Sequence, residues 1–213
     1  MQITWYGHSC FLLTAETGYS ILTDPCDSET GYELKDILCD AVTVSHDHHD
    51  HNCLSSVAGT PLVIRTPGEH TAGDILVTGF SSYHDDQLGA RRGENIVFSY
   101  RIDGLNVLHL GDLGHMLSDD TVEKIGNVDV LLAPIGGVFT INAKTATVLA
   151  DRLNAKVLIP MHYKTPALHF NVEGLEPLLA ENAGRRTHFL NANTATLTRD
   201  ALGERRLLIL DYK

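Results

Sequence analysis

The sequence predicts an α/β fold for one domain that spans residues 1–213. Strand-like runs joined by turn signals fill the first half of the chain, and helix and strand patterns alternate in the second half. No internal repeat and no Pro/Ser-rich or charge-blocked linker divides the sequence. A domain of this length buries a core without disulfides or a structural metal, so a bound metal is expected to serve chemistry.

Paired strands are expected in the first half. Residues 4–13 are rich in aromatic and β-branched residues, and a turn signal separates them from a similar run at 19–23, which predicts an opening hairpin. Residues 40–45 have the apolar, β-branched character of a buried strand. Further strands are expected at 61–65, 74–78, 95–102 and 106–110, the last two joined by an Asp-Gly turn.

The second half has the pattern of βαβ units. Helices are predicted at 118–124, 143–154 and 173–182, and strands at 128–135, 156–160, 187–190 and 206–210. The first two of these strands are almost continuously apolar, which is typical of parallel strands covered on both faces. Ligands of such sheets bind at the C-terminal ends of the strands.

The segment with the most unusual composition is the run HDHHDH at positions 46–51, which directly follows the strand predicted at 40–45. A solvated polar loop or an adventitious histidine cluster is the alternative interpretation. Residues of ligand type recur downstream in matching contexts, which favours a metal site.

Alternate residues of this run can serve two metal ions. In an extended chain His46 and His48 project to the same side and can bind one ion together. After a turn, Asp50 and His51 would point toward a second ion beside the first. His49 with His51 is an alternative pair, but we expect His49 to be solvated or to support a ligand.

Three further residues of ligand type follow predicted strands, namely His84, Asp112 and His162. The glycines near Asp112, Gly111 and Gly114, would let the backbone come close to something bound there. Each residue alone could belong to an ordinary turn or surface loop. Their recurrence at strand ends predicts that they meet the histidine run.

When these residues are grouped by which side chains can reach the same ion, they are expected to form two metal sites with a shared carboxylate. The first site would contain His46, His48 and His84, and the second would contain Asp50, His51 and His162, with Asp112 between them. Each ion would keep an open position, which is typical of catalytic sites. Nitrogen and carboxylate ligands suit zinc, and they also suit manganese, iron or nickel.

This arrangement predicts hydrolysis. Two divalent ions roughly 3.5–4 Å apart can share a water and lower its pKa toward ~7. We therefore predict a dinuclear hydrolase, with zinc as the expected metal, in which a metal-bridging hydroxide attacks a small ester, lactone or phosphodiester. Asp50 is the predicted catalytic residue, because it can orient the bridging water and pass a proton to the leaving group.

Weaker signals concern the surroundings of the predicted site. A lone histidine in a strand-like run is usually an ordinary core residue, which is one interpretation of His8. The other is that His8 faces the substrate and Asp24 holds a metal-binding histidine by a hydrogen bond. His115 is a further candidate for these surroundings, and Tyr163 and His169 are candidates for substrate contact.

The composition limits the partners. With 27 acidic residues against 16 basic ones and a net charge of −11, the chain lacks the basic stripe of a nucleic-acid binder. No stretch approaches the ~20 apolar residues that span a membrane, and the start lacks a signal-peptide pattern. The four cysteines form no CxxC pair and are expected to be reduced in a cytoplasmic protein. The expected partner is a small-molecule substrate, and this composition is compatible with a homo-oligomer.

With these residues in view, the chain resembles hydrolases of the metallo-β-lactamase superfamily. The HxHxDH motif of that family is matched by His46, His48, Asp50 and His51, and the match continues with His84, Asp112 and His162. Gly7-His8-Ser9, Thr23-Asp24-Pro25 and the runs 109–115 and 134–137 resemble a short branch related to L-ascorbate-6-phosphate lactonases and similar metal-dependent hydrolases. The resemblance implies an αββα sandwich: two mixed β-sheets face to face, helices outside, and the site at one edge.

The resemblance leaves the reaction open, because this fold hosts lactonases, thioesterases, phosphodiesterases, nucleases and oxygenases. One alternative is a mononuclear iron oxidoreductase of the persulfide-dioxygenase kind, with His46, His48 and Asp112 as ligands, in which His51 and His162 would be superfluous. Another is a binding protein that keeps the metal site without turnover. Only about 50 residues separate Asp112 from His162, which leaves no room for the extra domain of RNA-processing members.

Overall fold

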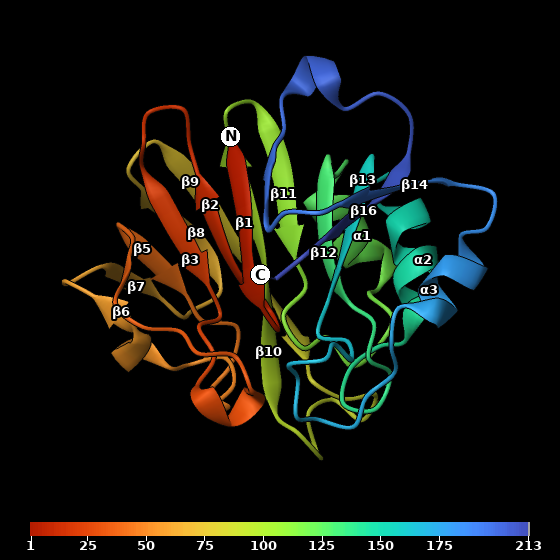
Figure 1. Cartoon of the computed structure of the whole chain (residues 1–213), viewed down its shortest axis with the longest axis horizontal. Helices are drawn as coiled ribbons and strands as arrows, with labels where there is room; N and C mark the ends of the chain where they lie inside the picture. Colours follow the sequence, from red (N-terminus) through yellow and green to blue (C-terminus); the bar gives the residue numbers. More distant parts are fainter. Residues whose placement is uncertain (213) are drawn as a thin grey trace.

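Two mixed β-sheets pack face to face in the computed structural model, which describes residues 1–212 (Figure 1). The first sheet consists of β1 (Gln2–Gly7), β2 (Cys10–Thr14), β3 (Ser20–Thr23), β5 (Ala41–Thr43), β7 (Leu62–Ile64) and β15 (Thr194–Thr196). Its strand order is β15-β1-β2-β3-β5-β7. Pairing is antiparallel from β15 to β3 and parallel from β3 to β7.

The second sheet is larger and is also mixed. It consists of β8 (Gly68–Ala72), β9 (Ile75–Tyr83), β10 (Glu94–Ile102), β11 (Leu105–His109), β12 (Val130–Pro134), β13 (Val157–Met161), β14 (Arg186–Leu190) and β16 (Arg206–Leu210). Its order is β14-β16-β13-β12-β11-β10-β9-β8, parallel from β14 to β11 and antiparallel from β11 to β8. Two short strands, β4 (Ile37–Leu38) and β6 (Val57–Ala58), pair separately.

The core lies between the two sheets and follows from the alternation of side chains along each strand. In β1 and β2 the alternating residues Ile3 and Phe11 are fully buried, and Phe98 of β10 is buried in the same cluster. Each such side chain contributes roughly 1.5–3 kcal/mol relative to exposure. The hydroxyls of Thr43 and Tyr100, 2.7 Å apart, form a buried hydrogen bond from one sheet to the other.

Three α-helices, α1 (Asp119–Ile125), α2 (Ala143–Arg152) and α3 (Glu176–Glu181), lie in the chain between β11 and β14. The side chains of Ser118 and Asn142 cap α1 and α2 by accepting hydrogen bonds from backbone N–H groups. Helix α2 contacts α3 and β12. No helix in residues 1–212 combines the length and the apolar character that a bilayer crossing requires.

The predicted fold class, two mixed sheets with flanking helices, is confirmed. One detail differs, because within the described chain the outer face of the first sheet carries no α-helix. Its apolar residues Leu22 and Val42 pack instead against the β4–β6 region, including Ile37 and Val57. Helix α3 is also shorter than the predicted 173–182, because it begins directly before Pro177, which suits the first helical turn.

The observed strands differ from the predicted ones in two respects. Residues 4–13 are not one strand but the hairpin β1–β2, which turns at His8 and Ser9. Gly7 has a φ of +104°, and a Cβ there would lie 2.2 Å from the Tyr32 ring, so glycine is required at this turn. The sequence analysis also missed β8 and β15, which are edge strands with weak apolar patterns.

Candidate metal centre

Side chains of ligand type from six segments meet where strands of both sheets end. His8 follows β1, Asp24 follows β3, residues 46–51 follow β5, His84 follows β9, Asp112 follows β11 and His162 follows β13. His8, Asp24 and His162 have positive φ angles of 50°, 39° and 50°. Asp and His adopt this backbone conformation more readily than most residues, so these sharp turns suit the residues that occupy them.

Two groups of candidate ligand atoms contain the predicted residues of the two sites. Those of His46, His48 and His84 lie within 4.8 Å of one another. Those of Asp50, His51 and His162 also lie within 4.8 Å of one another, and His8 belongs to the same group. The structure thus brings the predicted residues together in the predicted sets, and it adds His8 to the second.

Asp112 lies between the two groups. Its Oδ2 is 3.2 Å from Nε2 of His84, in the first group, and 3.2 Å from Nε2 of His162, in the second. Its Oδ1 is 3.2 Å from Nε2 of His51. One buried carboxylate therefore reaches both groups, which is the geometry that a bridging ligand requires.

Asp24 and Ser45 orient one histidine of each group. The Asp24 carboxylate accepts hydrogen bonds from the Ser45 backbone N–H at 2.8 Å, from the Ser45 hydroxyl at 2.6 Å and from Nδ1 of His51 at 2.9 Å. Since the hydroxyl proton goes to Asp24, Ser45 Oγ accepts from Nδ1 of His46 at 2.9 Å. Both rings are left with Nε2 as the atom that can bind a metal.

The donor set fits a divalent cation. With Nδ1 of His51 bound to Asp24, its Nε2 faces Oδ1 of Asp112 at 3.2 Å and Oδ2 of Asp50 at 3.6 Å. Within the described chain, His51 Nε2 and Asp112 Oδ1 are buried and form no hydrogen bond. A positive charge between these atoms, either a proton on Nε2 or a metal ion, stabilises the arrangement. Imidazole and carboxylate donors without thiolate are the set that zinc and related ions accept.

Charge at the site favours the same conclusion. Burial disfavours charge on His51, yet the carboxylates of Asp112 and Asp50 raise the pKa of His51 well above its ordinary value. Burial also opposes ionisation of Asp112, but His162 and His51 hold the pKa of Asp112 well below its usual range. These carboxylates remain ionised and attract positive charge. Burial lowers the pKa of His46 to about 3, so that ring is neutral, the form that binds a metal.

His8 is built into the second group through its backbone and its ring. Its carbonyl oxygen accepts hydrogen bonds from the Trp5 indole N–H at 3.1 Å and from the backbone N–H of His162 at 3.2 Å. Its ring lies 4.2 Å from the His162 ring, and its Nε2 is 3.1 Å from Asp50 Oδ2. Burial and the neighbouring His162 lower the pKa of His8 to about 4, so the ring is neutral at pH 7.

The loop that carries Asp112 packs on the segments that carry other ligands. The Asn95 side chain accepts a hydrogen bond from the Asp112 backbone N–H at 2.9 Å. A Cβ on Gly114 would lie 2.3 Å from the carbonyl carbon of His84. This corrects the prediction for the glycines: at Gly114 the close approach is to the backbone of a neighbouring protein segment.

Several predicted residues lie apart from the two groups. Within the described chain, His115, Tyr163 and His169 are not among the residues that line the cavity over the two groups, which is described below. Nε2 of His115 accepts a hydrogen bond from the Tyr83 backbone N–H, and the Tyr163 ring stacks on Trp5. His49 is exposed, and its Nδ1 forms a hydrogen bond to Oδ2 of Asp27 at 2.9 Å.

The cavity over the two groups has a volume of about 420 Å³. It is lined by His48, His49, Asp50, His84, Arg91, Arg92, Asp112, Phe139, His162 and Phe170. The sequence analysis missed both arginines and both phenylalanines. Neither pair follows a strand or belongs to a recognisable motif, so no local signal identifies them.

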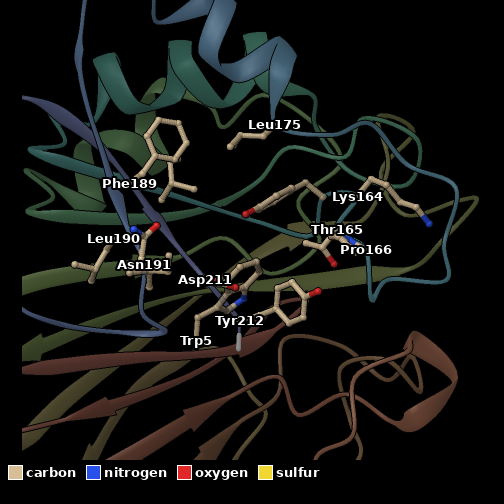
Figure 2. A pocket seen from close by; sticks show the side chains of 13 residues that line it. Trp5, Lys164, Thr165, Pro166, Leu175, Phe189, Leu190, Asn191, Asp211 and Tyr212 are labelled. Atoms are coloured by element: carbon tan, nitrogen blue, oxygen red, sulfur yellow. The ribbon is translucent and has the colours of Figure 1, made fainter.

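A second cavity, of about 260 Å³, lies beyond Tyr163. Figure 2 shows Trp5 and Tyr212 on one side of it and Leu175 and Phe189 on the other. Its lining includes a lysine and an aspartate but no histidine. Members of both candidate ligand groups line the first cavity, whereas this second cavity offers no imidazole.

Known proteins are similar to this chain in sequence and in fold. Residues 2–162 match the model of the β-lactamase superfamily domain. A UPF0173 metal-dependent hydrolase from Methanoregula boonei is 33% identical over 188 residues, which cover 78% of this chain and 83% of the relative. A relative of the same name from Nitratidesulfovibrio vulgaris is 30% identical, with 85% and 88% covered.

Solved structures are also similar to this chain. A crystal structure from Thermotoga maritima, assigned to the metallo-β-lactamase superfamily, has 39% sequence identity and a TM-score of 0.80, and the match covers 98% of this chain and 97% of that one. The diiron β-hydroxylase CmlA from Streptomyces venezuelae has 14% identity and a TM-score of 0.64 over 98% of this chain and 52% of its own, which shows the fold alone. From its matching domain, its relatives and its fold, the chain belongs to the metallo-β-lactamase superfamily, among the metal-dependent hydrolases.

Proposed function

We propose that this metal-dependent hydrolase binds two divalent ions, with zinc as the favoured metal, and cleaves a small ester, lactone or phosphodiester. The observation that carries the proposal is Asp112, whose two oxygens lie 3.2 Å from histidines of both ligand groups. The Thermotoga maritima relative is named as a proposed Zn-dependent hydrolase, which supports the choice of metal. A cavity of about 420 Å³ suits a small molecule.

His46, His48 and His84 would hold one ion, Asp50, His51 and His162 the other, and Asp112 both. When bound, such ions act as Lewis acids and lower the pKa of water toward ~7. Asp50 lines the cavity, and, although burial opposes its charge, His51 and His8 lower the pKa of Asp50 below its usual range. Asp50 therefore stays ionised and can accept a proton from a nucleophilic water, while His8 at 3.1 Å holds it in place.

Metal content per chain tests this proposal. We expect about two ions per chain in protein purified without an affinity tag, and about one in H162A, with hydrolysis of at least one ester, lactone or phosphodiester in the parent alone. H188A is the matched control, because His188 is exposed on β14 and lies outside both groups. One iron per chain in both proteins, with oxygen uptake, would replace the proposal with oxidoreductase chemistry.

A further inference from the structure

The loop that follows His84 is folded around one carboxylate. Asp85 is buried, and its side chain accepts hydrogen bonds from the backbone N–H groups of Gln87 at 2.8 Å, Gly89 at 2.9 Å, and Arg91 and Arg92 at 2.8 Å each. Four such bonds fix the path of residues 85–93 relative to the neighbouring ligand His84. The position of the two arginines is therefore built into the fold.

Both arginines line the metal cavity, and both are available for a ligand. Within residues 1–212, neither guanidinium forms an ion pair, although the chain carries a net charge of −11. The Arg92 guanidinium lies 5.5 Å above the Phe139 ring and donates one hydrogen bond to the Val138 carbonyl oxygen at 3.3 Å. An arginine has five N–H donors, so most of those of Arg92 remain free.

An aromatic wall adjoins the arginines. Phe139 is 38% exposed at the cavity, and its ring lies 6.3 Å from that of Phe170. The Phe170 ring in turn lies 5.6 Å from the ring of His8, in the second ligand group. A molecule bound in this cavity would thus meet both positive charge and apolar ring surface.

We propose that the substrate is an anion: Arg91 and Arg92 bind a phosphate or carboxylate group on it, and Phe139 and Phe170 contact its apolar part. The proposal rests on the proposed function for the cavity, and it excludes a neutral ester as the natural substrate. Planar guanidinium groups bind both kinds of oxyanion in bidentate fashion, and the ring beneath Arg92 keeps its guanidinium oriented.

Anion binding by the metal-loaded protein tests the proposal. Inorganic phosphate and benzoate would each be titrated calorimetrically into the parent, R91Q, R92Q and the double variant, with metal content measured for every sample. We expect the parent to bind at least one of the two anions and the double variant to bind it at least tenfold more weakly, because charge-assisted hydrogen bonds are lost. Whichever anion responds identifies the group as phosphate or carboxylate.

R101Q is the control that matches the change of charge in each single variant. Arg101 is exposed on β10, seven residues from Glu94 and roughly 23 Å along the strand from the site. We expect it to bind anions like the parent. Equal affinity in the parent and the double variant, or no binding of either anion by the parent, would overturn the proposal. Because the readout needs no turnover, a missing second ion or absent hydrolysis would count against the proposed function and not against this anion site.

Discussion

At the scale of single residues, the candidate site depends on side chains that bind no metal themselves. Asp24 is completely buried and receives three hydrogen bonds, two from Ser45 and one from His51. Through Ser45 it also sets the orientation of His46. The Asp24 carboxylate thus determines which ring nitrogen His46 and His51 each present. Its removal should therefore affect both ligand groups.

We expect D24N to lower the affinity for both ions by roughly 10–100-fold, the usual effect of removing a partner of a metal-binding histidine. The amide cannot accept from His51 and Ser45 as the carboxylate does. Competition with a chromophoric chelator measures the affinity. D40N is the control, because Asp40 accepts similar bonds from the Ser20 N–H and hydroxyl just before β5 begins. Unchanged affinity in D24N would show that these bonds do not orient the ligands.

At the scale of elements, the turn after β9 is the clearest case of one residue that organises a loop. The four N–H groups that donate to Asp85 outweigh its burial and lower the pKa of Asp85 to about 2. The folded state therefore prefers the ionised form more strongly than the unfolded chain, in which an aspartate has a pKa of ~3.9. The stabilisation is fully present above about pH 4 and is lost as the pH falls toward 2.

D85N should accordingly have a lower melting temperature than the parent at pH 7, and the difference should disappear as the pH falls from about 4 to about 2. Thermal unfolding followed by circular dichroism over this range measures it. D86N is the neighbouring control, since Asp86 is exposed. A difference that persisted at pH 2 would mean that the charge of Asp85 is not its source. D85N should also weaken the binding of whichever anion the parent binds, because it releases Arg91 and Arg92.

Sequence patterns identified the elements whose signal is local. The strands β12 and β13 are buried along their whole length, and each was predicted within two residues of its observed bounds. The strands β8 and β15 were missed because their own residues give little apolar signal: Gly68–Ala72 contains no large apolar side chain, and Thr194–Thr196 is only three residues long.

The same limit applies to the candidate site. The histidine run and the strand-end residues stand out by composition and position, and the structure brings them together. The Asn95 side chain on β10 supports the Asp112 backbone, and the Arg92 guanidinium lies over the Phe139 ring at the wall of the cavity. Such pairs arise only when distant segments fold against each other, and one sequence contains no trace of them.

At the scale of the whole molecule, the two sheets are joined mainly by apolar packing, with a polar link at Thr43 and Tyr100. Both hydroxyls are buried, so removal of either leaves the other without its partner. We expect T43V and Y100F each to lower the free energy of unfolding by about 1–3 kcal/mol.

The double variant T43V/Y100F should lose clearly less than the sum of the two single losses, because no orphaned hydroxyl remains. Urea denaturation gives the three values. Additive losses would show that the two hydroxyls act independently. Metal content should stay that of the parent in all three variants, since this pair contacts none of the proposed ligands.

The bond from the His162 backbone N–H to the His8 carbonyl oxygen joins the first turn of the chain to the last proposed ligand. Ligands drawn from residues 8 to 162 can assemble only after both sheets have docked, so native metal binding is a late event in folding. A nascent chain that ends before residue 162 already carries the histidine run but lacks His162, so it can bind ions in a non-native geometry. Refolding with chelator present, followed by metal addition, should therefore recover more native protein than refolding in excess metal.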